Sequence, residues 1–499
     1  MKRIAAILLA GLLAAMQVSA AGLPESIQKV IDASPVARTA FWGMQVVDLA
    51  SGKTIYELNP EHYFVPASNA KLFSTALALT RLGADHTFQT RVLADAAPDA
   101  SGRISGGLRL VGGGDPNLNA RAIPYRMGPA PGDPLAGIQD LADQIVARGV
   151  KRVDGDITGD DTWYVWQPYA VGWGIDDPMS DDGPPISALT LNDNVLTLHV
   201  GPGAGVGSPA ALSLLPAAEV FRIENRVRTV GVGGERRIHF ERLPGSRDAR
   251  LWGTVPLRDR GQDLLISVED PAQFAAQALR TALERRGVTV SGTALAAHLY
   301  PDEVGDLSQA EPPAAPLGIE LARRVSAPLL EDLRITAKVS QNLHAEMLLR
   351  AVGRARRNVG SFEAGMAEMK AFLGEIGIEP GAYNLLDGSG LSRLDLLTPA
   401  TVVKLLRYMY DSPLRDKWIS ILPVGGQDGT LSSRFGSTPA AGRVYAKTGS
   451  LSHVSALSGY LQRADGTWLA FSLLVNNYGG RTAAEVRGVM DRICNLILE

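Results

Sequence analysis

The chain has 499 residues, of which 45% are hydrophobic, with 49 Lys plus Arg against 52 Asp plus Glu. This length exceeds one ordinary core and predicts two or three domains. The near balance of charge excludes the basic excess that is typical of nucleic-acid-binding proteins, so we expect no nucleic-acid partner. The lone Cys494 excludes an intrachain disulfide and a cysteine-rich zinc site.

Residues 1–20 predict a secretory signal peptide. Lys2 and Arg3 precede an apolar run that ends at Met16, and small residues lead up to Ala20. The run is too short to span a bilayer comfortably, although an uncleaved anchor or a buried helix is the alternative. We therefore expect cleavage after Ala20 and an exported protein without a transmembrane anchor.

Residues 21–92 predict the beginning of an α/β domain. The apolar runs at residues 40–48 and 53–58 are typical of two paired strands. A helix is expected from Ser68 to Leu82, because Gly83 follows as a C-terminal stop.

Residues 93–296 differ from the flanking segments, because they are rich in glycine, proline and short alternating runs. Strands are expected at residues 107–111, 190–200, 237–242 and 264–268, and helices at residues 135–149 and 271–286. We interpret this segment as one or two inserted β-rich domains. The Pro-rich residues 311–316 are expected to link it back to the first domain.

The C-terminal part is expected to complete the first domain, which would comprise residues 21–92 and 297–499. Strands are expected at residues 443–446, 456–461 and 468–476, and a helix at residues 481–498. Strands at both ends of the chain, with helices between and after them, predict one α/β domain with an antiparallel sheet flanked by helices.

A first motif, Ser68-Asn69-Ala70-Lys71, opens the predicted helix. Residues three apart share a helix face, so the hydroxyl of Ser68 and the amine of Lys71 can meet. A serine hydroxyl is a weak nucleophile and needs a neighbouring base, which a lysine supplies when burial or a nearby cation keeps it neutral. A second match, Ser26 to Lys29, lacks an apolar helix behind it and is expected at the surface.

Two further motifs lie far along the chain. Ser340-Gln341-Asn342 separates two helical stretches, where a serine can relay a proton and an asparagine can hold an amide; an ordinary helix cap is the alternative. Lys447-Thr448-Gly449-Ser450 follows a predicted strand, where a lysine and a hydroxyl can fix a carboxylate; a hairpin turn with a solvated lysine is the alternative.

S-x-x-K, S-x-N and K-T-G in this order are the motif set of β-lactamases and penicillin-binding proteins. The chain resembles the serine D-alanyl-D-alanine carboxypeptidase/endopeptidase family, which includes penicillin-binding protein 4. Further matching stretches are residues 112–116, 159–160, 187–189, 192–194, 387–393 and 428–430. Several of them lie in the inserted segment, which β-lactamases lack. The resemblance therefore implies a transpeptidase/β-lactamase-like domain that carries two inserted domains.

The resemblance implies the catalytic roles. Ser68 would be acylated and Lys71 would be its base. Ser340 would pass the proton to the leaving D-alanine, and Asn342 would position the peptide. The middle residue of this motif is Gln341, where the family usually has Asp.

The resemblance also implies the binding roles. Lys447 and Thr448 would bind the terminal carboxylate, and the backbone N–H groups of Ser68 and Ser450 would form the oxyanion hole. Asp160 and Arg393 would contact the side chain of the penultimate diamino acid, since an aspartate suits its amine and an arginine its carboxylate.

The expected activity is hydrolysis of peptidoglycan stem peptides at the terminal D-Ala–D-Ala bond, at the D-Ala–diaminopimelate cross-link, or at both. No metal or organic cofactor is expected, because the seven histidines include no H-E-x-x-H motif and the glycine clusters lack a G-x-G-x-x-G pattern. β-Lactams would act as covalent inhibitors, and the family implies the periplasm. A serine β-lactamase and a non-catalytic cell-wall binding module are the alternatives.

Overall fold

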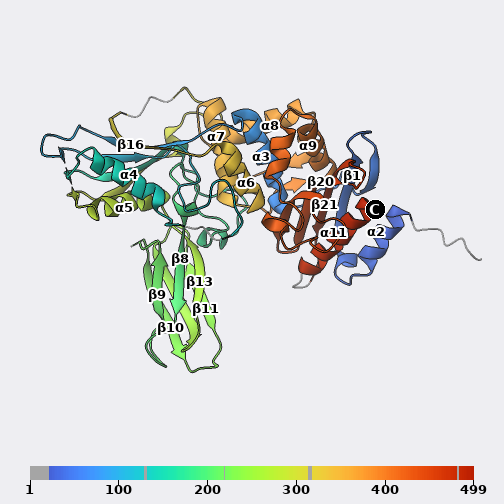
Figure 1. The fold of residues 1–499 in the computed structure, drawn as a ribbon, viewed down its shortest axis with the longest axis horizontal. Coiled ribbons are helices and arrows are strands. Elements are labelled where there is room, and N and C mark those ends of the chain that lie inside the picture. The colour runs from blue at the N-terminus through green and yellow to red at the C-terminus, as the bar shows by residue number, and fades with distance from the viewer. Residues whose placement is uncertain (1–21, 129–131, 219, 313–316, 480–482) are drawn as a thin grey trace, which may run out of the picture.

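The computed structural model describes residues 22–128, 132–218, 220–312, 317–479 and 483–499. The predicted signal peptide lies outside these residues. Within the described part of the chain, no helix combines the length and apolarity needed to cross a membrane. Figure 1 shows a helix-rich body at the right, a smaller α/β body at the left, and a β-stranded arm that projects downward.

A five-stranded antiparallel sheet joins the two ends of the chain. Its order is β19-β20-β21-β1-β2. The strands are β1 (Phe41–Asp48), β2 (Thr54–Leu58), β19 (Val444–Leu451), β20 (Val454–Gln462) and β21 (Trp468–Asn476). The first strand, β1, pairs with the last strand, β21, along its whole length. The expected sheet from both ends of the chain is thereby confirmed, and β19 lies at its edge.

Helices cover both faces of this sheet. One face packs against α2 (Leu23–Asp32) and α11 (Ala483–Leu498), whose apolar side chains share a core with alternate residues of β20 and β21. The other face packs against a helical group. Its members are α3 (Lys71–Leu82), α6 (Leu329–Lys338), α7 (Asn342–Arg357), α8 (Phe362–Glu375), α9 (Pro399–Asp411) and α10 (Arg415–Ile421).

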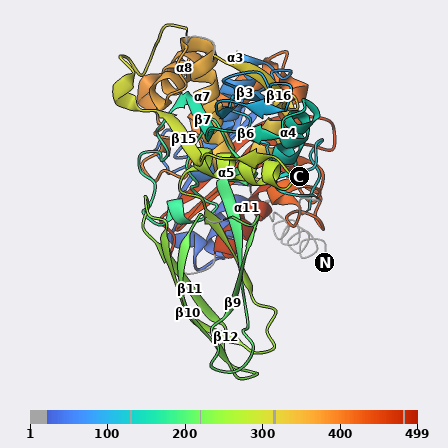
Figure 2. The same cartoon turned by 90° about the vertical axis from the view of Figure 1, so that its left-hand side faces the viewer.

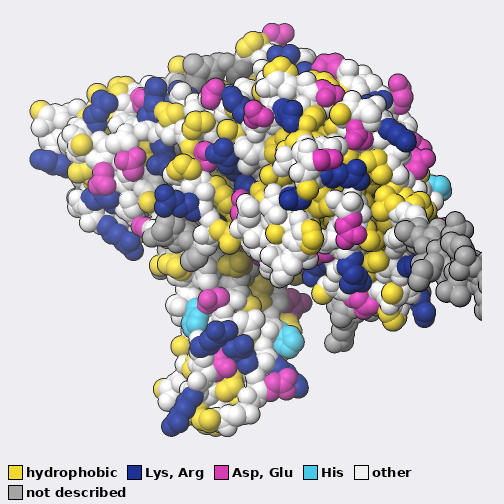
Figure 3. Space-filling view, turned by 45° about the vertical axis from the view of Figure 1, so that its right-hand side comes forward, with side chains coloured by type: hydrophobic (Ala, Val, Ile, Leu, Met, Phe, Trp, Pro, Cys, Tyr) yellow, Lys and Arg dark blue, Asp and Glu magenta, His cyan; other side chains and the backbone are white. Residues whose placement is uncertain are grey.

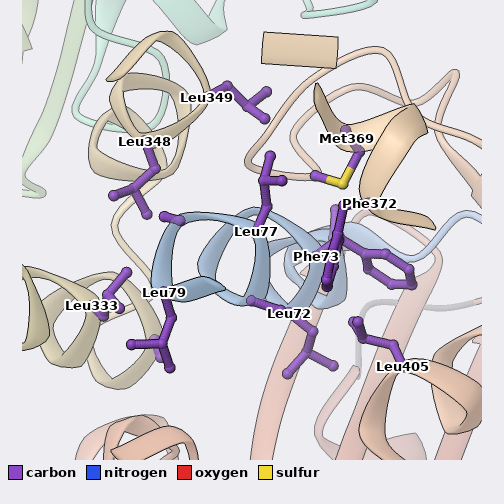
Figure 4. Close-up of a cluster of buried hydrophobic side chains, with 14 of the residues drawn as sticks. Leu72, Phe73, Leu77, Leu79, Leu333, Leu348, Leu349, Met369, Phe372 and Leu405 are labelled. Carbon is purple, nitrogen blue, oxygen red and sulfur yellow. The ribbon is translucent and has the colours of Figure 1, made fainter. Parts of the chain in front are cut away.

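Helix α3 lies at the centre of the helical group. Its residues from Lys71 to Leu79 are all buried, because α6, α7 and α8 surround it. Figure 4 shows Leu72, Phe73, Leu77 and Leu79 of α3 among apolar side chains of these neighbours. A helix that is buried on all sides is held rigidly, so the residue that precedes it is also fixed in position.

A second five-stranded sheet forms the smaller body. Its order is β15-β7-β5-β3-β16. The strands are β3 (Gln89–Ala94), β5 (Leu108–Val111), β7 (Ile157–Val165), β15 (Ala294–Leu299) and β16 (Ile319–Val325). Helices α4 (Ala136–Ala147) and α5 (Pro271–Glu284) pack against it, and a short sheet of β4 (Arg103–Ile104), β6 (Arg152–Val153) and β14 (Thr289–Val290) adjoins it.

The limits of the inserted segment, residues 93 and 296, remain a prediction. The pairing of β3 with β16 bears on them, because both strands extend this second sheet beyond those limits. The chain therefore leaves and re-enters the main body next to this strand pair.

The arm consists of two three-stranded sheets, β13-β8-β9 and β10-β12-β11 (Figure 2). The strands are β8 (Val195–Gly201), β9 (Ala211–Leu215), β10 (Arg222–Val230), β11 (Arg237–Arg242), β12 (Asp248–Pro256) and β13 (Gln262–Ser267). The strand expected at residues 190–200 begins only at Val195, because Asn192, Asp193 and Asn194 adopt positive φ angles and form a turn. Figure 3 shows Lys, Arg and His side chains spread over the arm.

Candidate active site

A cavity of about 740 Å³ lies where the three sequence motifs meet. The first motif precedes α3, the second is the turn between α6 and α7, and the third lies on the edge strand β19. The cavity is lined by Ser68, Ser340, Asn342, Thr448 and Ser450, among others. Residues almost 400 positions apart in the sequence therefore share one cleft.

The Ser68–Lys71 pair has the expected contact but a different local structure. Residues Ala67–Ala70 form a 3-10 turn, and the α-helix begins only at Lys71. Lys71 Nζ lies 2.9 Å from Ser68 Oγ. Lys71 is fully buried, whereas Ser68 is half-buried and lines the cleft. The hydroxyl is thus open to a substrate while its neighbouring amine is shielded from water.

The other two neighbours of Lys71 Nζ are both oxygen acceptors. They are Asn342 Oδ1 at 2.5 Å and the carbonyl oxygen of Ser389 at 2.6 Å. The amide of Asn342 is oriented by its Nδ2, which donates to the carbonyl of Asp182 at 2.7 Å. A neutral amine has two N–H groups and one lone pair. Because both oxygens only accept, the lone pair of neutral Lys71 must face the hydroxyl of Ser68.

Burial favours the neutral form of the two lysines beside the cleft, Lys71 and Lys447. It lowers the pKa of Lys71 to about 8, although the carboxylates of Asp387 and Glu346 favour the charged form. Burial and the positive charge of Lys71 also lower the pKa of Lys447 well below its usual range. The two ammonium groups oppose each other, so charging one favours the neutral form of the other.

The carbonyl of Ser389 is held by a buried turn between β17 (Tyr383–Asn384) and β18 (Leu396–Leu397). Glu346 Oε1 accepts the N–H groups of Gly388 and Ser389 at 2.8 and 2.9 Å. Asp387 accepts further N–H groups of the same turn. The sequence predicted no role for Glu346, because its function here is to hold a backbone group.

Ser340 lines the opposite side of the cleft, and the fully buried Lys447 lies behind it. Lys447 Nζ donates to Ser340 Oγ at 2.8 Å and to the carbonyl of Thr448 at 2.9 Å. Thr448 Oγ1 lies 2.8 Å from Thr430 Oγ1. The expected strand end at residue 446 is wrong: β19 continues to Leu451, because residues 447–451 pair with β20.

Two contacts fix β19 against the turn that carries Ser68. Asn69 Nδ2 donates to the carbonyl of Lys447 at 3.0 Å. A Cβ atom on Gly449 would lie 2.7 Å from the carbonyl oxygen of Pro66, so only glycine allows this close approach. The distance between the first and third motifs is therefore set by backbone packing.

Gln341 connects the second motif to the inserted segment. Its Nε2 donates to Asp193 Oδ2 at 3.0 Å, and its Oε1 accepts the N–H of Leu343. Asp193 also forms an ion pair with Arg121. His344 Nε2 lies 3.3 Å from the same carboxylate. Burial disfavours the charge of Asp193, but Arg121 and His344 outweigh it and lower the pKa of that carboxyl.

The structure separates the two residues expected to contact the penultimate side chain. Arg393 lines the cleft and donates to the carbonyl of Ser452 at 3.2 Å. Asp160 is buried in β7, where its carboxylate accepts from the N–H and hydroxyl of Thr162. It is not part of the cleft lining, and its contact with the substrate stays a prediction. A β-strand aspartate that caps its own backbone explains its place without a ligand.

No cluster of three or more His, Cys, Asp or Glu side chains is arranged to hold a metal ion in the part of the chain that the structure describes. The cleft presents the hydroxyls of Ser68 and Ser340, and the buried amines of Lys71 and Lys447 lie directly behind them. These groups together define a serine acyl-transfer site.

Known proteins are similar to this chain over most of its length. The model of the D-Ala-D-Ala carboxypeptidase 3 (S13) family matches residues 23–496. A D-alanyl-D-alanine carboxypeptidase of Actinomadura sp. (strain R39) is 35% identical over 470 residues, which cover 92% of this chain and 81% of that protein. A carboxypeptidase of the same kind from Haemophilus influenzae is 24% identical and covers 87% of this chain and 85% of its own.

The fold is also known. The crystal structure of penicillin binding protein 4 from Haemophilus influenzae has a TM-score of 0.79 at 24% identity and covers 95% of this chain and 99% of that one. A structure of the same protein with a β-lactam has a TM-score of 0.73 at 23% identity, with 94% and 98% covered.

The chain belongs to the D-Ala-D-Ala carboxypeptidase 3 (S13) family. It is a serine-type D-Ala-D-Ala carboxypeptidase, as the motifs predicted.

Proposed function

We propose that this carboxypeptidase acts on peptidoglycan stem peptides through an acyl-enzyme on Ser68, and that it cleaves both terminal D-Ala–D-Ala bonds and D-Ala–diaminopimelate cross-links. The observation that carries the proposal is the set of three contacts of Lys71 Nζ. Two acceptor oxygens leave the lone pair of the neutral amine with no direction but the Ser68 hydroxyl.

The first half of the reaction forms the ester. Ser68 Oγ attacks the carbonyl carbon of the acyl D-alanine while its proton passes to Lys71. The oxyanion is stabilised by the backbone N–H groups of Ser68 and Ser450. When the intermediate collapses, the peptide C–N bond breaks and the leaving nitrogen takes a proton through Ser340. In the second half, water attacks the ester carbonyl while Lys71 accepts its proton; the C–O bond to Ser68 then breaks, and Ser68 Oγ takes the proton back from Lys71.

Lys447 and Thr448 bind the carboxylate of the leaving residue in this proposal. An anionic substrate beside Lys447 favours the charged form of that lysine. A charged Lys447 in turn favours neutral Lys71, because the two lysines disfavour each other's charge. Substrate binding thus prepares the base. Asn342 holds the acyl-side amide, and Arg393 contacts the side chain of the penultimate residue from the other end of the cleft.

The cellular setting is part of the proposal. Residues 1–20 act as a cleaved signal peptide, and the enzyme works in the periplasm, where its substrate lies. Residues 93–296 form the inserted domains. β-Lactams acylate Ser68 as slow mimics of the D-Ala–D-Ala terminus, and the reaction requires no metal or organic cofactor.

Intact-protein mass spectrometry after penicillin treatment tests the nucleophile. We expect one penicilloyl adduct per chain, located on Ser68 by peptide mapping, and none on the Ser68→Ala variant. Release of D-alanine from a pentapeptide stem should be lost in the same variant. An adduct on another residue contradicts the proposal, and rapid turnover of a chromogenic β-lactam would instead favour a β-lactamase.

A further inference from the structure

A second cavity, of about 750 Å³, adjoins the catalytic cleft. Val339 and Thr430 line both cavities, so the two spaces meet beside Ser340. None of the roles assigned above uses this second cavity. We call it the side cavity.

The side cavity is built from two parts of the chain that are distant in sequence. The main body contributes Lys338, Gly429 and Ser432, and the inserted segment contributes the loop of residues 119–128. The backbone N–H of Tyr125 donates to Glu331 Oε2 of α6 at 3.1 Å, and Asn119 Nδ2 donates to Asp193 Oδ1 at 3.0 Å. The loop is therefore attached near one end to α6 of the main body and at the other end to the turn that carries Asp193.

The lining of the side cavity is basic. It contains Arg121, Arg126 and Lys338 against the single carboxylate of Asp193. Arg121 is paired with Asp193, and Lys338 Nζ lies 2.6 Å from Asp428. Arg126 is exposed and has no carboxylate within ion-pairing distance among the described residues. It is the cation of this lining that remains available for an anionic ligand.

The position of the side cavity assigns it to one side of the scissile bond. In the proposed reaction, Ser340 passes a proton to the leaving nitrogen, and Thr448, whose hydroxyl contacts Thr430, binds the carboxylate of the leaving residue. Val339 and Thr430, which separate the two cavities, thus flank the leaving residue. Arg393, which the proposed function places on the acyl side, lines the catalytic cleft and not the side cavity.

We propose that the side cavity is a binding site for the acidic peptide that continues beyond the leaving residue of a cross-link, with Arg126 as its charge-recognising group. This inference rests on the proposed function of the catalytic cleft. A single leaving D-alanine ends before the side cavity, whereas the leaving strand of a cross-link continues past Val339 and Thr430 and carries further carboxylates. The site therefore distinguishes cross-links from terminal dipeptides.

Steady-state kinetics on two substrates test the site. We compare Arg126→Ala, Arg126→Lys and the control Arg258→Ala, an exposed arginine of the arm, on a pentapeptide stem and on a purified cross-linked muropeptide dimer. We expect Arg126→Ala to lower kcat/KM on the dimer by about three- to tenfold, the size of one partly solvated charge-assisted contact. Release of D-alanine from the pentapeptide should be unchanged, and Arg126→Lys should keep most of the dimer activity.

A dimer in which only the carboxylates beyond the leaving residue are amidated provides a second measurement. It should be cleaved more slowly by the wild type and should be insensitive to Arg126→Ala. Equal effects of Arg126→Ala on dimer and pentapeptide, no effect on either, or no cleavage of the dimer by the wild type would each overturn the site. None of these outcomes touches the proposed nucleophile, whose failure would be seen as full activity of Ser68→Ala on the pentapeptide.

Discussion

Gln341 differs in charge from the aspartate that the family usually has at this position, and its surroundings explain why an amide fits. The Nε2 group of Gln341 donates to a buried carboxylate, Asp193, which Arg121 and His344 already hold in the charged form. An amide supplies a donor at this point, whereas a second carboxylate would meet the first one.

Gln341→Asp should therefore slow acylation by a β-lactam by about tenfold at pH 8, because two neighbouring carboxylates repel each other and displace Ser340. The rate relative to wild type should recover toward pH 5, where the introduced carboxyl becomes protonated. Stopped-flow acylation rates at both pH values measure this. The neutral variant Gln341→Asn is the control, and a ratio to wild type that does not vary with pH would rule out the charge argument.

The side chains of the three motifs were predictable from the sequence, but the groups that hold them in position were not. Ser68, Lys71, Ser340, Asn342, Lys447 and Thr448 belong to motifs with a fixed spacing, and the structure brings them together. The contact of Lys71 with the Ser389 carbonyl carries no signal in the sequence, because every residue has a carbonyl group. The role of Asp160 stays a prediction, because a buried, backbone-capping aspartate looks the same in sequence as a substrate-binding one.

At the level of elements, the edge strand β19 lies unusually close to the turn before α3. Gly449 permits this approach, since a Cβ atom there would meet Pro66, Ala456 and Ala67 at once. The strand is longer than predicted for a related reason: its pairing with β20 is set by a partner, and no local pattern shows where pairing stops.

Gly449→Ala should push β19 away from Ser68 and lower the acylation rate by about a hundredfold, the usual cost of misplacing a reacting group by about 1 Å. The matched control is Gly374→Ala in α8, where nothing lies within 4 Å of the added methyl. That control should keep full activity and gain about 0.5–1 kcal/mol in free energy of unfolding. Acylation rates and urea unfolding measure both effects; unchanged acylation in Gly449→Ala would contradict the role of this contact.

At the scale of the whole molecule, His298 connects two strands and a helix of the smaller body. It lies on β15 and contacts Asp161 of β7 at 2.8 Å and Asp270, the N-cap of α5, at 3.4 Å. Burial opposes its charge, but the hydrogen bonds to the two carboxylates prevail and raise the pKa of His298 to about 9. The ordinary value for histidine is 6.5, so the folded state binds this proton more tightly than the unfolded state does.

The stability that His298 contributes should be complete below about pH 6.5 and lost as the pH rises through about 9. The Tm of the wild type should therefore fall between pH 7 and pH 9.5, and the fall should be smaller in His298→Gln. Part of the slope should remain, because the pKa of the buried His344 is also raised to about 9. Thermal unfolding across this range measures it, with His239→Gln on the exposed face of the arm as control; equal slopes in wild type and His298→Gln would refute the assignment.

The arrangement of the chain into sheets was partly predictable from the sequence. The strands at both ends of the chain were predictable, because each is shown by its own apolar pattern and by the turn residues beside it. They pair in one sheet, as expected. The order β15-β7-β5-β3-β16 was not predictable, since parallel pairing depends on contacts between residues far apart in sequence. The division of the arm into two three-stranded sheets was not predictable either, because it too depends on which strands pair.

The pairing of β1 with β21 determines when the cleft can form. Ser68 comes long before Lys447 in the sequence, so β19, which carries Lys447, and its partner β20 are synthesised well after the nucleophile. A growing or prematurely ended polypeptide has the nucleophile and lacks the pocket that makes it reactive. The complete cleft therefore requires that segments from both ends of this sequence have been made and have paired in one sheet.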